Sequence, residues 1–328
     1  MKCINKWICL SLLIAVSCVS GCGKTSAAIE QPYDVYATAA DFGLSSNGTA
    51  EAKSYFASDL CVSEDVAIGT DSTDSQVAEG AGTFNLETNT VVYAKNLYER
   101  LYPASTTKIL TAYIALKYCD DLDAMVTVNE NAVNQASDSS VCNLKAGDVI
   151  RLRDLLYGLM LRSGNDAAVA IAEYISGDVD SFAALMNQEA AAMGATRSHF
   201  VNPNGLPDEN HYTCVYDMYL IFSNAIKNDT FVSIIGTTSY DVTYTDASGE
   251  AVTHTWENTN QYLTGNATTP DGFQIVGGKT GTTGEAGYCL VLYSYNPSGQ
   301  PIISIVFKAD GKSNLYLLMN EMLQGFAI

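Results

Sequence analysis

The spacing of apolar residues changes twice along the chain, and these changes restrict the possible folds more than any other feature of the sequence. In the middle, apolar residues recur every three or four positions, which is typical of helices with one buried face. This pattern predicts helices over 106–118, 152–162, 166–175, 179–193 and 213–228. On either side the pattern predicts a β-hairpin with a polar turn over 83–96, strands over 240–244, 251–256, 287–296 and 301–308, and a last helix over 313–325. The order predicts an α+β fold: an antiparallel β-sheet flanked by helices, with a largely helical subdomain and with sheet strands from both ends of the chain.

The first 21 residues have the features of a lipoprotein signal peptide. Lys2 and Lys6 precede an apolar run, 7–19, that is shorter than the ~20 residues needed to span a bilayer. The run ends in Val19-Ser20-Gly21-Cys22, which resembles a bacterial lipobox, where the cysteine is lipidated and becomes the new N-terminus. We expect residues 1–21 to be removed, and lipid on Cys22 to anchor the exported protein to the outer face of the cytoplasmic membrane, facing the cell wall. An ordinary signal peptide with an incidental cysteine is the alternative.

A polar, acidic segment follows the signal peptide. Between 23 and 79 there are ten acidic residues and two basic ones, Lys24 and Lys53, with little hydrophobic periodicity. This composition predicts a mostly flexible tether over 22–79, within which 55–62 is apolar enough to dock, and a folded domain over 80–328. The cysteines beyond Cys22 are odd in number and widely spaced, which predicts mostly free, buried thiols. They are Cys61, Cys119, Cys142, Cys214 and Cys289.

Charge and histidine content argue against several classes of protein. The chain has 36 acidic residues against 17 basic ones, a net charge of −19, so it lacks the positive charge that nucleic-acid binding needs. It has three histidines, no HExxH motif and no close pair of CxxC motifs. We therefore expect no nucleic-acid partner and no metal site.

Three short motifs occur in an order that suits one chemistry. They are Ser105-Thr106-Thr107-Lys108 at the start of a predicted helix, Ser163-Gly164-Asn165 between helices, and Lys279-Thr280-Gly281 before the last strands. Ser105 and Lys108 are about one helical turn apart, so the lysine can accept the proton of the serine hydroxyl. Burial and the nearby charge of Lys279 would lower the pKa of Lys108 and keep its amine neutral part of the time. The helix N-terminus would stabilise the anion that develops at an attacked carbonyl.

The motifs and their surroundings resemble the low-molecular-mass penicillin-binding proteins, the serine D-alanyl-D-alanine carboxypeptidases. Besides the motifs, the similar segments are the hairpin 84–96 and the runs 102–112, 161–168, 199–206 and 277–283. The similarity covers about 81–326 and implies a β-lactamase/transpeptidase-like fold. It implies that the protein removes the terminal D-Ala of peptidoglycan stem pentapeptides through an acyl-enzyme. β-Lactam antibiotics would then be covalent inhibitors, and no metal or organic cofactor would take part in the reaction.

The resemblance also implies roles for individual residues. Ser105 would be the nucleophile, Lys108 its general base, and Ser163 the relay that carries a proton to the departing D-Ala. The substrate-binding residues would be Asn165, Lys279, Thr280, Gly281 and Thr282. Backbone N–H groups of Ser105 and Thr282 would form the oxyanion hole. The segment 202–208 is interpreted as a structural loop at the rim of the cleft, and His199 and His211 as packing or loop residues.

Two departures from the family pattern affect these expectations. Many relatives follow the last sheet strand with an arginine that helps to bind the substrate carboxylate, but 306–312 contains no arginine. Lys308 or Lys312 could supply the charge without the bidentate geometry of a guanidinium. Many relatives also carry a C-terminal β-domain and an amphipathic anchor helix, which we do not expect here.

Two other functions are compatible with the same motifs. A class A-like serine β-lactamase uses a similar set of residues and adds a glutamate that activates the deacylating water. The glutamates between Ser163 and Lys279 do not lie in the ExxLN context of that enzyme; they are Glu173, Glu189, Glu209, Glu250 and Glu257. The other alternative is a binding or sensor module that is acylated by β-lactams without turnover.

Overall fold

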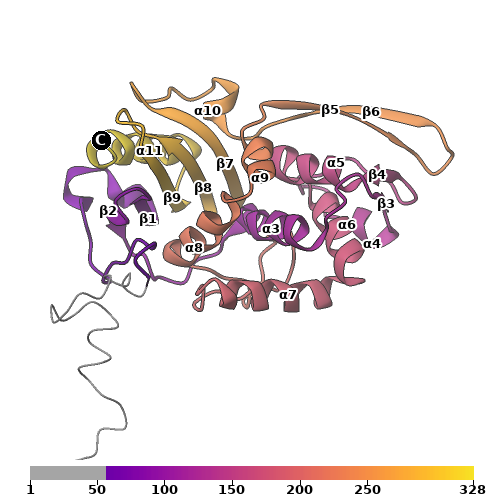
Figure 1. The fold of residues 1–328 in the computed structure, drawn as a ribbon, viewed down its shortest axis with the longest axis horizontal. Coiled ribbons are helices and arrows are strands. Elements are labelled where there is room, and N and C mark those ends of the chain that lie inside the picture. The colour runs from indigo at the N-terminus through magenta and orange to yellow at the C-terminus, as the bar shows by residue number, and fades with distance from the viewer. Residues whose placement is uncertain (1–56) are drawn as a thin grey trace, which may run out of the picture. The chain divides into compact units, whose positions relative to one another are not determined.

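A five-stranded antiparallel sheet forms the centre of the folded unit, Asp59–Ile328, in a computed structural model that describes residues 57–328 (Figure 1). The strands are β1 (Ala78–Asn85), β2 (Thr90–Lys95), β7 (Gln274–Thr283), β8 (Gly287–Tyr295) and β9 (Pro301–Ala309), in the order β2-β1-β9-β8-β7. β1 pairs with β9, so the sheet combines strands from both ends of the folded chain. This arrangement confirms the antiparallel sheet predicted from the sequence.

The ordered chain begins earlier than the boundary at 80 that composition indicated. Residues 59–79 belong to the same unit and include the short 3-10 helices η1 (Thr70–Ser72) and η2 (Ser75–Val77). The backbone N–H of the buried Cys61 donates to Tyr219 Oη over 2.9 Å, and Ile68 forms a β-bridge with Ala94. Tertiary contacts thus order a segment whose composition resembles that of a linker. The signal peptide, Cys22 and the first part of the tether lie outside the described residues.

The central block is helical, as the sequence predicted. Its main helices are α3 (Lys108–Tyr118), α5 (Leu152–Tyr157), α6 (Asn165–Ser176), α7 (Val179–Ala192) and α8 (Val215–Ala225), with the shorter α4 (Glu130–Val133) and α9 (Asp229–Ile235). The 3-10 turn η3 (Ala104–Thr107) leads directly into α3. The helix predicted over 152–162 differs in detail, because α5 gives way to a π-helical turn, η4 (Gly158–Arg162).

A second, four-stranded sheet lies against the helical block (Figure 1). Its order is β3-β4-β5-β6, from β3 (Met125–Thr127), β4 (Val149–Arg151), β5 (Ser239–Thr245) and β6 (Ala251–Glu257). The sequence predicted β5 and β6 but not a separate sheet, because β3 and β4 are three residues long and show no hydrophobic period. The short α10 (Gln261–Thr264) connects β6 to β7.

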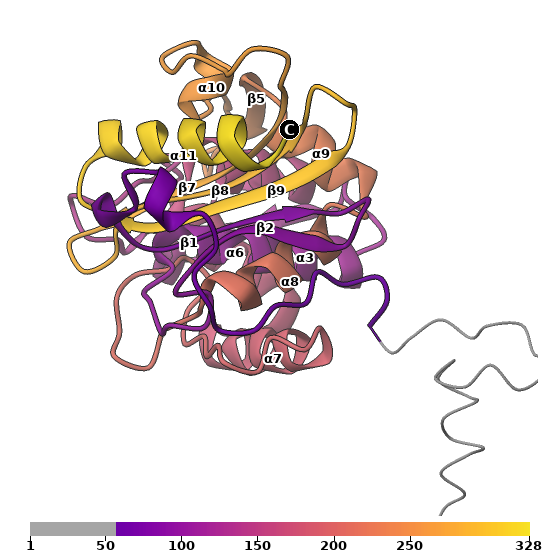
Figure 2. The same ribbon diagram turned by 90° about the vertical axis from the view of Figure 1, so that its left-hand side faces the viewer.

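The last helix, α11 (Lys312–Phe326), covers one face of the central sheet, and α8 and α3 lie on the other (Figure 2). Two apolar clusters result: one between the sheet and the helical block, and one between the sheet and α11. The residues predicted to face inward from α11 are all buried: Leu315, Leu318, Met319 and Met322. The predicted packing of this helix is therefore confirmed.

The expected cost of disrupting this packing is large. Leu318→Ala removes a side chain that is 0% exposed, so the free energy of unfolding should fall by about 2–5 kcal/mol, measured by denaturant titration. The neighbouring Leu317 is 47% exposed, and Leu317→Ala should change stability by no more than about 0.5 kcal/mol. Equal effects of the two substitutions would contradict this packing of α11.

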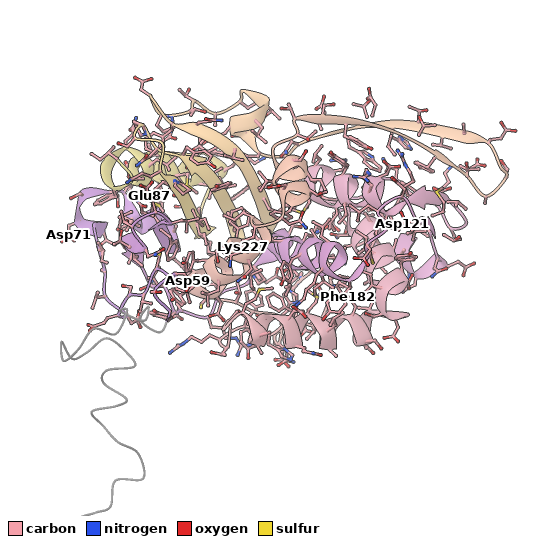
Figure 3. All side chains as sticks on the ribbon, viewed as in Figure 1. Asp59, Asp71, Glu87, Asp121, Phe182 and Lys227 are labelled. Carbon is pink, nitrogen blue, oxygen red and sulfur yellow. The ribbon has the colours of Figure 1, made fainter. Side chains whose placement is uncertain are left out.

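Charged side chains surround this core, as the exposed Asp71, Glu87 and Asp121 illustrate (Figure 3). The five cysteines of the described region are free thiols, and all except Cys119 are buried, as the sequence predicted. Within 57–328, no helix has both the length and the apolar character to cross a bilayer.

Candidate active site

The three sequence motifs converge where the helical block meets β7. Ser105 lies in η3, Ser163 follows the π-turn η4, and Lys279 lies in the middle of β7. Hydrogen bonds join the three motifs: Lys108 Nζ contacts Asn165 Oδ1, 57 positions away, and Lys279 Nζ contacts Ser163 Oγ, 116 positions away. The predicted grouping of these motifs is present in the structure.

Lys108 is completely buried directly behind Ser105. Its Nζ lies 2.8 Å from Ser105 Oγ and 2.8 Å from Asn165 Oδ1. A third contact, of 2.6 Å, joins Nζ to the backbone carbonyl of Asn204. Burial, and secondarily the charge of Lys279, hold the pKa of Lys108 well below its ordinary value. A neutral amine next to a serine hydroxyl can accept the hydroxyl proton.

Lys279 and Ser163 form the second pair. Lys279 Nζ donates to Ser163 Oγ over 3.0 Å and to the carbonyl of Thr280 over 2.9 Å. Burial lowers the pKa of Lys279 to about 7. Ser163 itself has a left-handed backbone, φ +61°, at the end of the π-turn. Such non-glycine conformations and π-turns are enriched at functional sites.

Two glycines allow other segments to approach the backbone at Ala104 and Ser105 closely. A Cβ atom at Gly281 would lie 2.9 Å from the backbone nitrogen of Ser105, so β7 can approach η3 this closely because the residue is glycine. On the other side, a Cβ at Gly205 would lie 1.8 Å from the carbonyl oxygen of Ala104. Gly281, expected among the substrate-binding residues, thus sets the distance between β7 and the backbone of the nucleophile.

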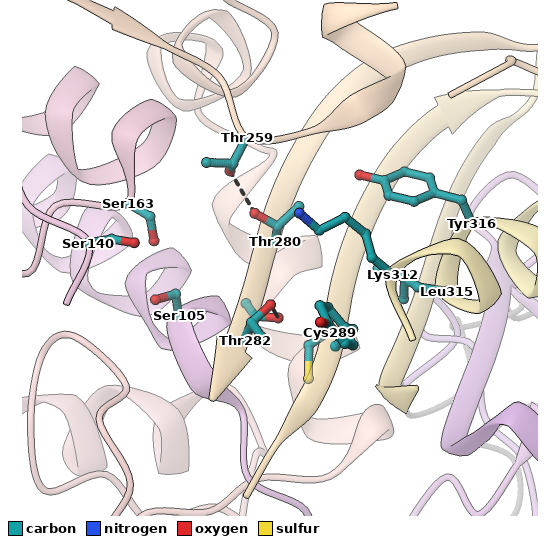
Figure 4. Close-up of a pocket in the computed structure, with 12 residues that line it drawn as sticks. Ser105, Ser140, Ser163, Thr259, Thr280, Thr282, Cys289, Lys312, Leu315 and Tyr316 are labelled. Atoms are coloured by element: carbon teal, nitrogen blue, oxygen red, sulfur yellow. Dashed lines mark hydrogen bonds between the residues drawn. The ribbon is translucent and has the colours of Figure 1, made fainter. Parts of the chain in front are cut away.

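Ser105 lines two cavities, the smaller of which is drawn in Figure 4. One cavity, of about 210 Å³, lies between the serines and α11 and is lined by residues that include Ser163, Thr280 and Thr282. The other, of about 390 Å³, extends past Asn165. Ser105 and Thr282 line both cavities, so a bound chain could continue on either side of the reacting atoms.

Several lining groups had no signal in the sequence. Ser140 lines both cavities from a loop, and its backbone carbonyl accepts a hydrogen bond from the Asn165 N–H over 2.8 Å. Thr259 shares a 2.6 Å hydrogen bond with Thr280. The carbonyl of Asn204 contacts Lys108 through the backbone. A backbone group carries no residue signature, and Ser140 and Thr259 lie in segments without periodicity.

The structure distinguishes the two lysines that could replace the missing arginine. Lys312, the first residue of α11, lines the smaller cavity and is directed toward Thr280 (Figure 4). Lys308 instead forms an ion pair with Glu79, with Nζ 2.7 Å from Oε1. Lys312 therefore supplies positive charge to the cleft, together with Lys279.

Over residues 57–328, no group of three or more His, Cys, Asp or Glu side chains is arranged to hold a metal ion. The chemistry in the cleft comes from hydroxyl, amine and amide groups. Two serines and two buried lysines beside an antiparallel sheet define the class: a serine enzyme with lysine in the position where triad enzymes use histidine.

The chain belongs to the D-alanyl-D-alanine carboxypeptidase family, whose sequence model matches residues 69–311. It is 33% identical over 251 residues to D-alanyl-D-alanine carboxypeptidase DacF of Bacillus subtilis, covering 75% of this chain and 61% of that protein. It is 34% identical over 265 residues to the D-alanyl-D-alanine carboxypeptidase of Streptomyces sp. strain K15, covering 76% of this chain and 88% of that protein.

Solved structures agree with this assignment. The crystal structure of the Streptomyces K15 DD-transpeptidase superposes with a TM-score of 0.71 at 33% identity, covering 77% of this chain and 98% of that one. The D-alanyl-D-alanine carboxypeptidase DacD from Francisella tularensis gives a TM-score of 0.66 at 29% identity, with 75% and 69% covered. The predicted transpeptidase-like fold is confirmed.

Proposed function

We propose that the protein is a serine D-Ala-D-Ala carboxypeptidase that removes the terminal D-Ala from peptidoglycan stem pentapeptides and is acylated by β-lactams. The observation that carries the proposal is the fully buried Lys108, 2.8 Å from Ser105 Oγ in an open cleft. Family membership supports the choice of substrate. The chain spans about 61% of the length of the Bacillus relative, so the proposal concerns the activity of this domain.

The geometry supports a two-step reaction. Ser105 Oγ attacks the carbonyl carbon of the penultimate D-Ala while Lys108 takes its proton, and the oxyanion is stabilised by the backbone N–H groups of Ser105 and Thr282. The C–N bond then breaks, and the proton held by Lys108 passes through the Ser163 hydroxyl to the leaving D-Ala nitrogen, which leaves Lys108 neutral again. In the second step water adds to the ester while Lys108 accepts a proton from it. The bond between the acyl carbon and Ser105 Oγ then breaks, Lys108 returns the proton to Oγ, and the shortened peptide leaves.

Substrate binding uses the remaining groups of the cleft. Asn165 holds both the substrate amide and Lys108, to which its Oδ1 is already bonded at 2.8 Å. The terminal carboxylate meets the positive charge of Lys279 and Lys312 and the hydroxyl of Thr280. The larger cavity, beyond Asn165, receives the rest of the stem peptide.

Lys312 should contribute measurably to carboxylate binding. Lys312→Ala is expected to lower kcat/KM for a D-Ala-D-Ala peptide about tenfold, or ~1.4 kcal/mol, because a charge-assisted contact is lost. Lys312→Arg should retain or raise the value, since a guanidinium can bind a carboxylate through two bonds. Lys308→Ala is the matched control, and an equal loss in that variant would contradict the assignment.

One observation bears on the β-lactamase alternative. None of the five glutamates between Ser163 and Lys279 lines either cavity beside Ser105. The carboxylates that do line the larger cavity, Asp138 and Glu285, lie outside the stretch between Ser163 and Lys279. Without a glutamate in the position that a class A enzyme uses to activate the deacylating water, the penicilloyl ester should be hydrolysed slowly. Slow deacylation of penicillin, together with turnover of the peptide, is the combination expected of a carboxypeptidase.

The test uses the purified mature chain with two substrates. A pentapeptide ending in D-Ala-D-Ala should release D-Ala, and labelled penicillin should remain on the peptide that contains Ser105, as detected by mass spectrometry. Ser105→Ala should lose both reactions. Rapid release of penicilloic acid would favour a β-lactamase, a stable adduct without D-Ala release would favour a sensor, and no adduct would overturn all three. Adding an amine acceptor measures any transpeptidation.

We also propose that lipid on Cys22 holds the protein on the outer face of the cytoplasmic membrane. The Val19–Cys22 sequence supports this location, and these residues lie outside the described part of the chain. Cys22→Ala should release the protein to the medium or leave it unprocessed in cell fractionation. Metabolic labelling that detects no fatty acid on the wild-type chain would refute the proposal.

A further inference from the structure

The contacts of Lys108 determine where its lone pair points. A neutral amine has two N–H donors and one lone pair, whereas the charged form has three donors. Asn165 Oδ1 and the Asn204 carbonyl oxygen, at 2.8 and 2.6 Å, can only accept hydrogen bonds. In the neutral amine both N–H groups are therefore used by these two acceptors, and the lone pair faces Ser105 Oγ at 2.8 Å.

The Asn204 carbonyl is held by contacts with the start of α3. Thr111, one turn after Lys108, donates its hydroxyl to the carbonyl of Pro203 over 2.7 Å. Gly205 has φ +85° and lies against the backbone of Ala104, too close for any Cβ atom. The segment 203–205 is thus pressed against η3 and α3, and its side chains do not carry the contact with Lys108.

His211 connects the same segment to the residue that precedes Lys108. Its imidazole is 1% exposed. Nδ1 accepts a hydrogen bond from the Val201 N–H at 3.1 Å, which places the single proton of the neutral ring on Nε2. Nε2 lies 2.9 Å from Thr107 Oγ1 and donates to it. Burial lowers the pKa of His211 to about 4, so the ring is neutral at pH 7.

We infer that His211 is a positioning residue for the general base. By joining Val201 to Thr107, it fixes the segment that carries the Asn204 carbonyl, and this carbonyl aims the lone pair of Lys108 at Ser105. The inference rests on the proposed function, in which Lys108 is the base. Neither His211 nor Thr107 lines the cavities beside Ser105, so neither side chain contacts the substrate there, whereas Asn204 lines the larger cavity. We therefore expect the main effect on the chemical step and a smaller one on peptide binding.

The hydrogen bond between Thr107 and His211 can be removed by replacing either residue. Thr107→Val keeps the volume and removes the acceptor for Nε2, whereas Thr107→Ser keeps the hydroxyl. His211→Asn keeps an acceptor near Val201 and loses the donor to Thr107. We expect Thr107→Val and His211→Asn each to lower the acylation rate constant of Ser105 by labelled penicillin about tenfold or more, because small misplacements of reacting groups are costly. Thr107→Ser should stay within about twofold of wild type.

Three readouts separate positioning from loss of folding. The rate is counted per labelled site, so that unfolded molecules lower the labelled fraction and not the rate constant. In the peptide assay kcat should fall by a larger factor than KM rises. The double variant Thr107→Val, His211→Asn should be no slower than either single variant, because both remove one interaction. Thr83→Val is the matched control: its buried hydroxyl bonds Ser304 Oγ in the sheet, at 3.3 Å, and its rate should be unchanged.

The inference would be overturned if Thr107→Val and His211→Asn reacted at the wild-type rate per labelled site. A crystal structure of Thr107→Val provides a second test, which does not depend on activity. It should show the Asn204 carbonyl withdrawn from Lys108 Nζ beyond hydrogen-bonding distance, and an unchanged contact would contradict the inference. If wild type is not acylated at all, the proposed function fails, while the crystal structure still decides whether His211 places the carbonyl.

Discussion

Replacing Lys108 with methionine should lower the rate of penicillin acylation at Ser105 by about 10²–10⁴-fold. Methionine has a similar length and fills the buried space, but its thioether cannot accept the hydroxyl proton of Ser105. In the wild-type structure Ser105 Oγ lies 2.8 Å from Lys108 Nζ. In wild type the rate should fall as the pH drops through the lowered pKa of Lys108, because protonation removes the base. This acid limb should be lost in the variant. Stopped-flow labelling over a range of pH measures both effects.

Lys95→Met is the matched control for this substitution. Lys95 is a partly buried lysine on β2 whose Nζ also donates to backbone carbonyls, those of Ser75 and Ala78. Its loss should reduce stability without slowing acylation. If Lys108→Met kept a rate within tenfold of wild type, another group would have to be the base.

Gly281→Ala should reduce acylation by about 10²-fold or more, the usual effect of disturbing an oxyanion hole. The new methyl group would lie 2.9 Å from the backbone nitrogen of Ser105, so β7 and η3 must separate. Burst kinetics with labelled penicillin and with peptide measure the loss.

Gly284→Ala, three residues along the same segment, provides the comparison. A Cβ atom at Gly284 has no neighbour within 4 Å and its backbone needs no positive φ. This variant should acylate at the wild-type rate. Equal losses in the two variants would show that the effect does not arise from the contact with Ser105.

The parts of the fold that were predictable are those with long periodic segments. The apolar residues of α11 determine one buried face, so its packing followed from the sequence. The apolar residues on both sides of the polar turn 87–90 predicted the hairpin of β1 and β2, although β1 is buried on both faces. The candidate site was predictable for the same kind of reason. Ser105, Lys108 and Lys279 belong to motifs whose spacing within regular elements fixes the direction of the side chains.

What the sequence did not reveal depends on contacts between distant segments. β3 and β4 are strands because they pair with each other and with β5, and three residues are too few for a period. Residues 59–79 are ordered by contacts such as Cys61 with Tyr219, although their composition is that of a linker. The Asn204 carbonyl enters the site through the backbone. Local propensity contains none of this information.

The pairing of β1 with β9 has a consequence for the order of events during synthesis. Thr83 and Ser304, whose side chains touch across this pair, are separated by 221 positions. Until the last strands have been made, β1 and β2 form a hairpin with an open edge, and an isolated hairpin is at best marginally stable in water. The central sheet therefore closes late, after most of the chain has left the ribosome, and loop closure over this distance is slow. During that interval the open edge of β1 is available for pairing with other chains, so a chaperone that covers this edge would reduce aggregation of the newly made protein.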